Sequence, residues 1–267
     1  MSAVLKQDIR KHYLSVIVWA VVLASYAFSV IYIFPNNNSN MSEVVSLLEV
    51  LPEAFNAMLG QAIFSGTVDG WMQMNFYSML GLIMAFYTIL TVCTIVTREI
   101  DTRTIEYTLS QPISRATLIL IRFLVFALST LVIMLTAFVS EWGTYIYYGY
   151  DMDITVHFLL YANFFVTNLM IGGIILLISV FMTNYNRLLM IGIAVVLALY
   201  VLTIAIQAMN ADPEPFVKYI SPFSYMQSDS LLVSGKIEMH NLWVPVIACA
   251  GCVAASAAVF RRKEIKI

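Results

Sequence analysis

Six stretches without a charged side chain constrain this sequence more than any other feature. Each lies between two charged residues and contains between 18 and 33 residues. A helix that crosses the hydrocarbon layer of a membrane, which is about 30 Å thick, needs about 20 predominantly apolar residues. The sequence therefore predicts an all-α integral membrane protein with six transmembrane helices. Their expected limits are residues 13–34, 73–96, 117–141, 157–182, 188–209 and 241–260.

The composition supports a membrane protein and argues against other classes. Hydrophobic residues make up 61% of the sequence and charged residues 11%, whereas soluble domains contain about 45–50% and about 25%. The formal net charge of −2 gives no basic excess, so we expect no nucleic acid among the partners. Neither an internal repeat nor a Gly/Ser linker divides the chain, and residues 1–267 are interpreted as a single transmembrane domain.

Lysine and arginine residues are distributed unevenly between the predicted loops. Of the 14, only Lys218 and Lys236 lie on one side of the predicted bundle. Because Lys and Arg are enriched on the cytoplasmic side of a membrane, both termini are predicted to be cytoplasmic. An even number of helices also requires the termini to share a side. The residues on the cytoplasmic side are Lys6, Arg10, Lys11, Arg98, Arg103, Arg115, Arg122, Arg187, Arg261, Arg262, Lys263 and Lys266.

Two amphipathic segments precede the first two predicted spans. Apolar residues at helical spacing between positions 4 and 13 alternate with Lys6, Arg10 and Lys11, which favours a short N-terminal amphipathic helix on the inner membrane surface. On the outer side, residues 44–59 carry an apolar stripe of helical period with Pro52 within it. This outer segment is interpreted as a lid over the spans or as the flank of a lateral exit path for a substrate.

A charged segment connects the second and third predicted spans on the cytoplasmic side. Glu99 and Arg103 stand four positions apart, which favours a helix that continues inward from the second span. Pro112 ends that helix, and Ser114 is suited to cap the next one. On spacing alone, the segment is equally consistent with a solvated loop and with a surface that binds a partner.

Neither a metal site nor a catalytic set is indicated. The cysteines fall inside predicted spans, with no disulfide or zinc spacing, and are expected to be small buried residues. The histidines lie at or beyond span ends without an acidic partner next to them, which favours isolated surface residues. These residues are Cys93, Cys249, Cys252, His12, His157 and His240.

Three charged or titratable residues lie near the ends of predicted spans. Arg122, Glu141 and His157 are expected to reach towards the headgroup region from there. Glu141 precedes Trp142 and several tyrosines, an arrangement typical of the aromatic belt at a membrane interface. We interpret Glu141 as part of this belt, with a role as an outer gate as the alternative.

The segment between the second and third spans resembles a known family. It is similar to the type-2 ABC exporter permease family in three consecutive pieces. These are Arg98-Glu99, Thr104-Ile105-Glu106-Tyr107-Thr108-Leu109-Ser110 and Gln111-Pro112-Ile113-Ser114-Arg115. The resemblance extends to the six-span topology, the N-terminal amphipathic helix and Tyr219-Ile220-Ser221-Pro222-Phe223 before the last span. It therefore covers nearly the whole chain.

The resemblance implies a permease subunit of the bacterial plasma membrane. Such a subunit pairs with a second permease, here expected to be a second copy, and with two cytoplasmic ABC ATPase subunits. A cytoplasmic coupling helix would contact the ATPase, and the turn around residues 183–187 would be a second contact. The expected interface residues are Arg98, Glu99, Arg103, Glu106, Tyr107, Asn184 and Arg187.

The chain is not expected to be an enzyme or to bind a cofactor itself. It contains no G-x-x-x-x-G-K-[ST] motif, so ATP and magnesium are expected on the partner ATPase. The resemblance implies export. Because the predicted spans hold almost no charge and offer Met and aromatic residues, we expect a hydrophobic or amphipathic substrate such as a peptide, toxin or antimicrobial, with lipid-linked or drug-like molecules as alternatives. Alternatives are a non-transporting scaffold or sensor and an ion-coupled secondary transporter, which would hold charged residues in mid-membrane. Candidate residues of a substrate path are Phe76, Met79, Tyr87, Phe165 and Met170.

Overall fold

A computed structural model describes residues 2–34, 46, 67–102, 114–208, 219–226 and 228–262. Within these residues every regular element is a helix, which agrees with the predicted all-α class. In chain order the elements are α1 (Ser2–Tyr32), α4 (Val68–Met72), η2 (Gln73–Tyr77), α5 (Ser78–Asp101), α7 (Arg115–Tyr148), α8 (Ile154–Phe181), α9 (Tyr185–Ala208), η3 (Pro222–Tyr225), α11 (Ser228–Ser234) and α12 (His240–Arg262).

Six of the described helical stretches are long and apolar enough to cross a membrane, as the sequence predicts. They are Asp8–Tyr32, Val68–Ile95, Arg115–Tyr148, Ile154–Phe181, Tyr185–Ile206 and His240–Arg262. The largest differences from the expected limits lie at the starts of the first and second stretches and at the end of the third. The second and third helices continue past a carboxylate, Asp69 or Glu141, that bounds a charge-free run.

The N-terminal amphipathic segment does not form an element of its own. Residues 4–13, expected to form a short helix before the first span, belong to α1, which is one continuous helix from Ser2 to Tyr32. Asp8, within this part of α1, is buried at 6% exposure. The amphipathic segment and the first span form one helix because residues 4–13 contain no Pro or Gly that would interrupt it.

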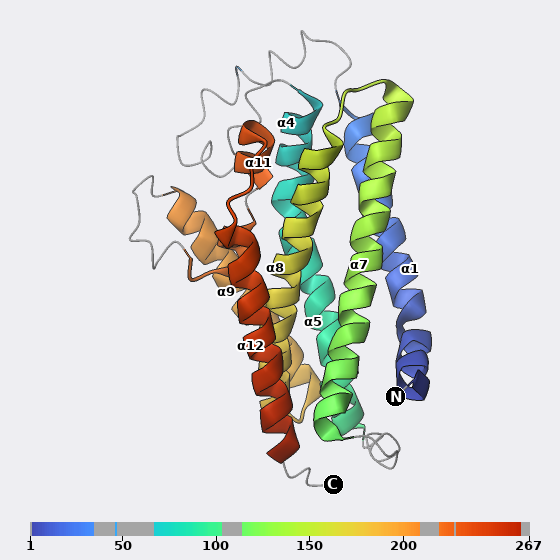
Figure 1. Ribbon diagram of the computed structural model, residues 1–267, viewed down its shortest axis with the longest axis vertical. Coiled ribbons are helices and arrows are strands. Elements are labelled where there is room, and N and C mark those ends of the chain that lie inside the picture. The colour runs from blue at the N-terminus through green and yellow to red at the C-terminus, as the bar shows by residue number, and fades with distance from the viewer. Residues whose placement is uncertain are drawn as a thin grey trace.

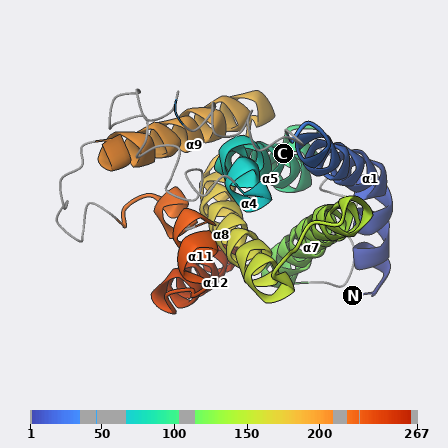
Figure 2. The ribbon, with the colours of Figure 1, turned by 90° about the horizontal axis from the view of Figure 1, so that it is seen from above.

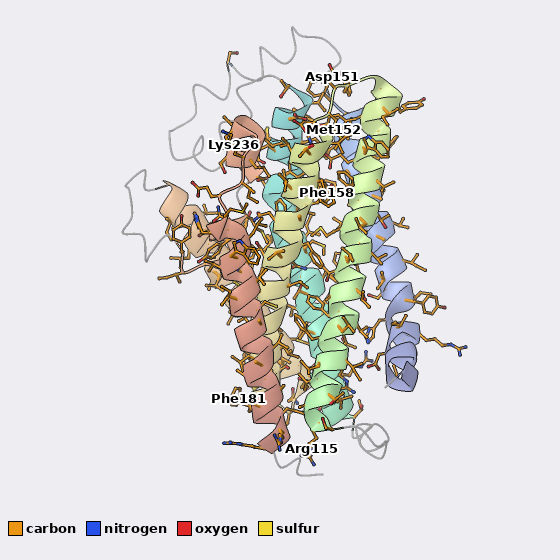
Figure 3. All side chains as sticks on the ribbon, in the orientation of Figure 1. Arg115, Asp151, Met152, Phe158, Phe181 and Lys236 are labelled. Atoms are coloured by element: carbon orange, nitrogen blue, oxygen red, sulfur yellow. The ribbon has the colours of Figure 1, made fainter. Side chains whose placement is uncertain are left out.

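Helices α5, α7, α8 and α12 run side by side along the long axis of the molecule, with α1 beside α7, whereas α9 is tilted across that axis (Figure 1 and Figure 2). The first residues of α1 and the last residues of α12 lie at one end of the bundle, called here the terminal end. Arg115 and Phe181 also lie at the terminal end, whereas Asp151, Met152 and Lys236 lie at the opposite end (Figure 3).

Helix α8 occupies the centre of the bundle. It packs against α5, α7 and α12, while α1 lies against α7 at one edge and α9 lies against α5 at another (Figure 2). A helix with neighbours on several sides needs apolar residues around most of its circumference, and residues 174–178 of α8 are a continuous run of Ile and Leu. The edge helices α1 and α9 bury fewer of their residues within the chain.

Small residues allow α8 and α12 to approach closely. A Cβ atom at Gly173 would lie 3.2 Å from Cβ of Cys252 and 3.4 Å from the carbonyl oxygen of Cys249. Glycine at such a position lets two helix backbones come together, as is common in membrane bundles. Cys249 is buried at 8% exposure and Cys93 at 0%, so both have the packing role expected from the sequence.

Candidate functional site

The second span contains an irregular turn at the end of the bundle opposite the termini. The Thr67 side chain accepts a hydrogen bond of 3.2 Å from Gly70 N–H and caps α4, which passes directly into the π-helix η2. A π-helical turn holds one more residue than an α-helical turn and often marks a functional site. Phe76 and Tyr77, the last two residues of η2, are buried at 0% and 1% exposure.

Six polar side chains gather around this turn from three spans. Asp69 and Tyr77 come from the second span, Glu141 and Tyr145 from α7, and His157 and Tyr161 from α8. We call these residues the buried polar cluster.

Glu141 is at the centre of the cluster and is fully buried. The Tyr77 hydroxyl donates a hydrogen bond to Oε1, and the Tyr161 hydroxyl donates one of 2.6 Å to Oε2. Nε2 of His157 lies 3.5 Å from Oε1. Both carboxylate oxygens therefore have a hydroxyl donor, and an imidazole lies beside one of them.

His157 is also fully buried, and its two ring nitrogens face different groups. Nδ1 lies 3.0 Å from the carbonyl oxygen of Asp153, which can only accept a hydrogen bond, so Nδ1 carries a hydrogen. Nε2 lies 3.6 Å from Oδ1 of Asp69 as well as beside Glu141. The same Asp69 oxygen accepts a hydrogen bond of 2.7 Å from the Tyr145 hydroxyl. His157 is thus placed between two carboxylates.

These positions correct three expectations from the sequence. Glu141 and His157 do not lie among the headgroup-facing residues, and Arg122 is likewise buried at 1% exposure. Glu141 turns inward although Trp142, its neighbour in α7, is 40% exposed. The expectation was wrong because it compared each residue only with its neighbours in sequence, whereas the partners of Glu141 come from other spans. A role for Glu141 as a gate stays a prediction.

One sequence signal does mark the cluster. Glu141 and Tyr145 are four positions apart, as are His157 and Tyr161, and each pair therefore shares one helix face. Two polar residues on one face of an otherwise apolar span indicate a partner inside the bundle. The identity of that partner depends on contacts between distant parts of the chain.

A second arrangement lies at the terminal end, where the last turn of α5 meets the start of α9. The backbone N–H of Tyr185 donates a hydrogen bond of 3.2 Å to Oδ2 of Asp101. The Arg98 guanidinium carbon lies 5.9 Å from the centre of the Tyr185 ring. Oδ1 of Asn184 accepts a hydrogen bond of 3.0 Å from Arg187 N–H and caps α9.

The two segments expected to contact an ATPase are therefore adjacent in the structure. Arg98, Asp101, Asn184 and Arg187 are exposed, and together with Tyr185 they form what we call the terminal-end surface. Glu99 lies in the last turn of α5. Arg103, Glu106 and Tyr107, the remaining candidates, lie outside the residues that the structure describes, as does most of the outer segment 44–59.

The five candidate residues of a substrate path do not share one exposed face. Phe76, Tyr87 and Met170 are buried at 5% exposure or less, Met79 is 38% exposed, and Phe165 is half-buried. Their role in transport stays a prediction.

The remaining histidines and possible metal ligands differ from His157. His240 is exposed, as expected, although Glu238 lies 3.5 Å from it. Across the described parts of the chain, no group of three or more His, Cys, Asp or Glu side chains is arranged to hold a metal ion.

Comparison with known proteins establishes the family. No curated protein matches the sequence at a significant level. A family model described as "ABC-2 family transporter protein" matches residues 2–265. This match covers all six apolar helices and both arrangements described above. The chain therefore belongs to the ABC-2 transporter family and is a multi-pass membrane permease subunit.

Proposed function

We propose that this permease is the membrane subunit of an ATP-driven exporter in a bacterial plasma membrane. Two copies would form the translocation unit and would bind two cytoplasmic ATPase chains, which hold ATP and magnesium. Binding and hydrolysis of ATP on those chains would drive export of a hydrophobic or amphipathic substrate, such as a peptide, toxin or antimicrobial.

The observation that carries this proposal is the contact between the end of α5 and the start of α9. Asp101 and Tyr185 connect the two segments through a hydrogen bond, and exposed Arg98 and Arg187 lie next to it. If both termini are cytoplasmic, as the distribution of Lys and Arg predicts, this terminal-end surface faces the cytoplasm. An ATPase bound there would contact both segments and move them together.

A continuous helical route leads from this surface to the buried polar cluster. Helix α5 begins immediately after η2, which contains Tyr77. A displacement of α5 at the terminal end would therefore reach Tyr77 and its hydrogen bond to Glu141. Since the cluster joins three spans, we propose that it holds them together at the outer end while the transporter is closed to that side. The ATPase would drive this movement only if its contact with the permease has a different energy in the closed state and in the state open to the outer side.

The edge helices support a homodimer. Helices α1 and α9 bury little of their apolar surface within the chain, so these surfaces are available to lipid or to a second copy. A path between two copies would be lined by such surfaces. Exposed methionine, as at Met79, adapts to varied apolar ligands, which supports an apolar or amphipathic substrate.

One observation favours a second candidate function. Ion-coupled carriers hold titratable side chains within the membrane, and Asp69, Glu141 and His157 form such a group. In that case a proton gradient, not an ATPase, would drive transport. Recovery of an ATPase with the chain separates the two candidates.

The direct test is affinity purification of the full chain from its native membrane in a gentle detergent, with identification of co-purifying proteins by mass spectrometry. We expect an ATPase with a G-x-x-x-x-G-K-[ST] motif. Arg98→Glu combined with Arg187→Glu should release it, because the charge on both segments is reversed. Lys236→Glu reverses a charge at the opposite end and should not. Absence of an ATPase from the wild-type sample would contradict the proposal and favour the ion-coupled candidate.

A further inference from the structure

A polar pocket lies between the first turns of α1 and the last turns of α5. Its volume is about 320 Å³, and it is lined by Asp8, Lys11 and His12 from α1 and by Thr94, Arg98 and Thr102 from α5 and the residue after it. A volume of this size falls at the lower end of the range for small-ligand sites, which is about 300–1,000 Å³. The pocket can therefore hold a group as large as a phosphate with its ester substituents.

The charges in the pocket suit an anion. Among the described residues of the lining, Lys11 and Arg98 each carry a fixed positive charge, His12 is a third potential cation, and Asp8 is the one carboxylate. The Thr94 and Thr102 hydroxyls donate to backbone carbonyls of their own helix turns, at 2.6 and 2.8 Å. Recognition of an anion therefore depends on the basic side chains.

The position of the pocket places it at a membrane boundary. The first apolar helical stretch begins at Asp8, and the second ends at Ile95, which also lines the pocket. Lys11 and Arg98 are exposed at this boundary, where lipid headgroups lie. A ligand with a phosphate would thus meet the pocket from the membrane surface at the terminal end.

An exposed apolar row leads away from the pocket along α1. Leu14 and Val18 stand three and seven positions after Lys11, so they share its side of the helix. They are 62% and 53% exposed. This row would contact acyl chains below a headgroup, and it offers nothing to a free phosphate ion.

From the pocket, its charge and this apolar row, we propose that the permease binds an anionic phospholipid between α1 and α5. Lys11 and Arg98, with His12, contact the headgroup phosphate, and Leu14 and Val18 contact an acyl chain. Because α1 packs mainly against α7, the bound lipid would add a connection between α1 and α5. The proposal depends on the membrane location of the chain. It shares Arg98 with the terminal-end surface, whereas Lys11 belongs to the pocket and not to that surface.

The test compares lipid binding by the full-length, delipidated protein and its variants. Phosphatidylglycerol and, separately, phosphatidylcholine are titrated in mixed micelles, and bound lipid is counted by native mass spectrometry. Lys11→Gln or Arg98→Gln should each weaken phosphatidylglycerol binding about fivefold, the effect of one basic residue at a membrane surface. Lys11→Arg retains the charge and should bind as the wild type does. Arg262→Gln removes an exposed cation on α12 at the same end and should have no effect.

Three further measurements distinguish a lipid from a free ion and keep the test valid if one variant fails to fold. Leu14→Ser with Val18→Ser should weaken phosphatidylglycerol binding, and inorganic phosphate at millimolar concentration should not raise the unfolding temperature. Lys11→Glu, at an exposed helix position, should weaken binding more than Lys11→Gln. The proposal is wrong if Arg262→Gln weakens binding as much as Lys11→Gln, if phosphatidylcholine binds equally well, or if inorganic phosphate alone raises the unfolding temperature.

Discussion

Nε2 of His157 lies 3.5 Å from Oε1 of Glu141, and both side chains are fully buried. The chain contains a second pair with the same separation, because Nε2 of His240 lies 3.5 Å from Oε2 of Glu238. Those two side chains are 43% and 62% exposed. Glu141 differs from Glu238 in its burial and in the hydrogen bonds that it accepts from Tyr77 and Tyr161, so the Glu238 pair serves as an exposed control.

Removal of the Glu141 carboxylate should destabilise the protein strongly. Glu141→Leu leaves the Tyr77 and Tyr161 hydroxyls without their acceptor and removes one of the two carboxylates beside the buried His157 imidazole. Loss of one partner in a buried charged group costs about 3–5 kcal/mol. A thermal unfolding measurement on purified protein should show a large decrease in the midpoint.

The matched control is Glu238→Leu. An exposed carboxylate is screened by water and contributes little to stability, so the unfolding midpoint should stay close to that of the wild type. If Glu238→Leu and Glu141→Leu lowered the unfolding midpoint equally, burial of Glu141 would not be the cause of the destabilisation.

The two tyrosines that donate to Glu141 should act as a coupled pair. Tyr77→Phe and Tyr161→Phe each remove one hydroxyl from the same carboxylate and should each cost about 1.5–3 kcal/mol. Because both hydroxyls donate to Glu141, the loss of unfolding free energy in the double variant should differ from the sum of the losses in the two single variants. A double-mutant cycle on unfolding free energies measures this coupling.

Tyr147→Phe provides the control for the tyrosine variants. Tyr147 lies on the same helix as Glu141 but is 78% exposed, and loss of its hydroxyl should leave stability unchanged. Strict additivity of Tyr77→Phe and Tyr161→Phe would argue against a shared carboxylate.

The number and approximate position of the spans could be predicted because the hydrocarbon layer demands long apolar helices. Charged residues seemed to mark the ends, but Asp69 and Glu141 lie within helices. A local pattern does not distinguish a buried, paired carboxylate from one at the membrane surface. The distinction depends on partners such as Tyr77 and Tyr161, which are 64 and 20 positions from Glu141.

The terminal-end surface was partly predictable. Sequence resemblance predicted two separate ATPase contacts, one at Arg98 and one at the turn with Asn184 and Arg187, and their binding to an ATPase stays a prediction. Their adjacency results from the packing of α9 against α5, which no local pattern encodes. The roles of Asn184 in capping α9 and of Asp101 in binding Tyr185 N–H likewise required the structure.

Close packing of α8 and α12 should depend on glycine at position 173. In Gly173→Ala the new methyl group would lie 3.2 Å from Cβ of Cys252, an atom attached to the α12 backbone that can move only if the helices separate. Overpacking of this kind costs about 1–3 kcal/mol. The unfolding midpoint should therefore decrease.

A second glycine serves as the comparison. A Cβ atom at Gly143 would meet nothing within 4 Å, and alanine favours a helix over glycine by about 1 kcal/mol. Gly143→Ala should therefore unfold at the wild-type temperature or slightly above it. A decrease as large as that for Gly173→Ala would indicate a general effect of glycine replacement in these helices.

The most direct test of ATPase coupling is photo-crosslinking in native membranes. A photo-reactive amino acid replaces Arg187 at the terminal-end surface in one strain and Lys236 at the opposite end in another, and mass spectrometry identifies the crosslinked proteins. We predict an ATPase with a G-x-x-x-x-G-K-[ST] motif crosslinked at position 187 and not at position 236. Crosslinking of the ATPase at 236 alone, or of no ATPase at either position, would contradict the account.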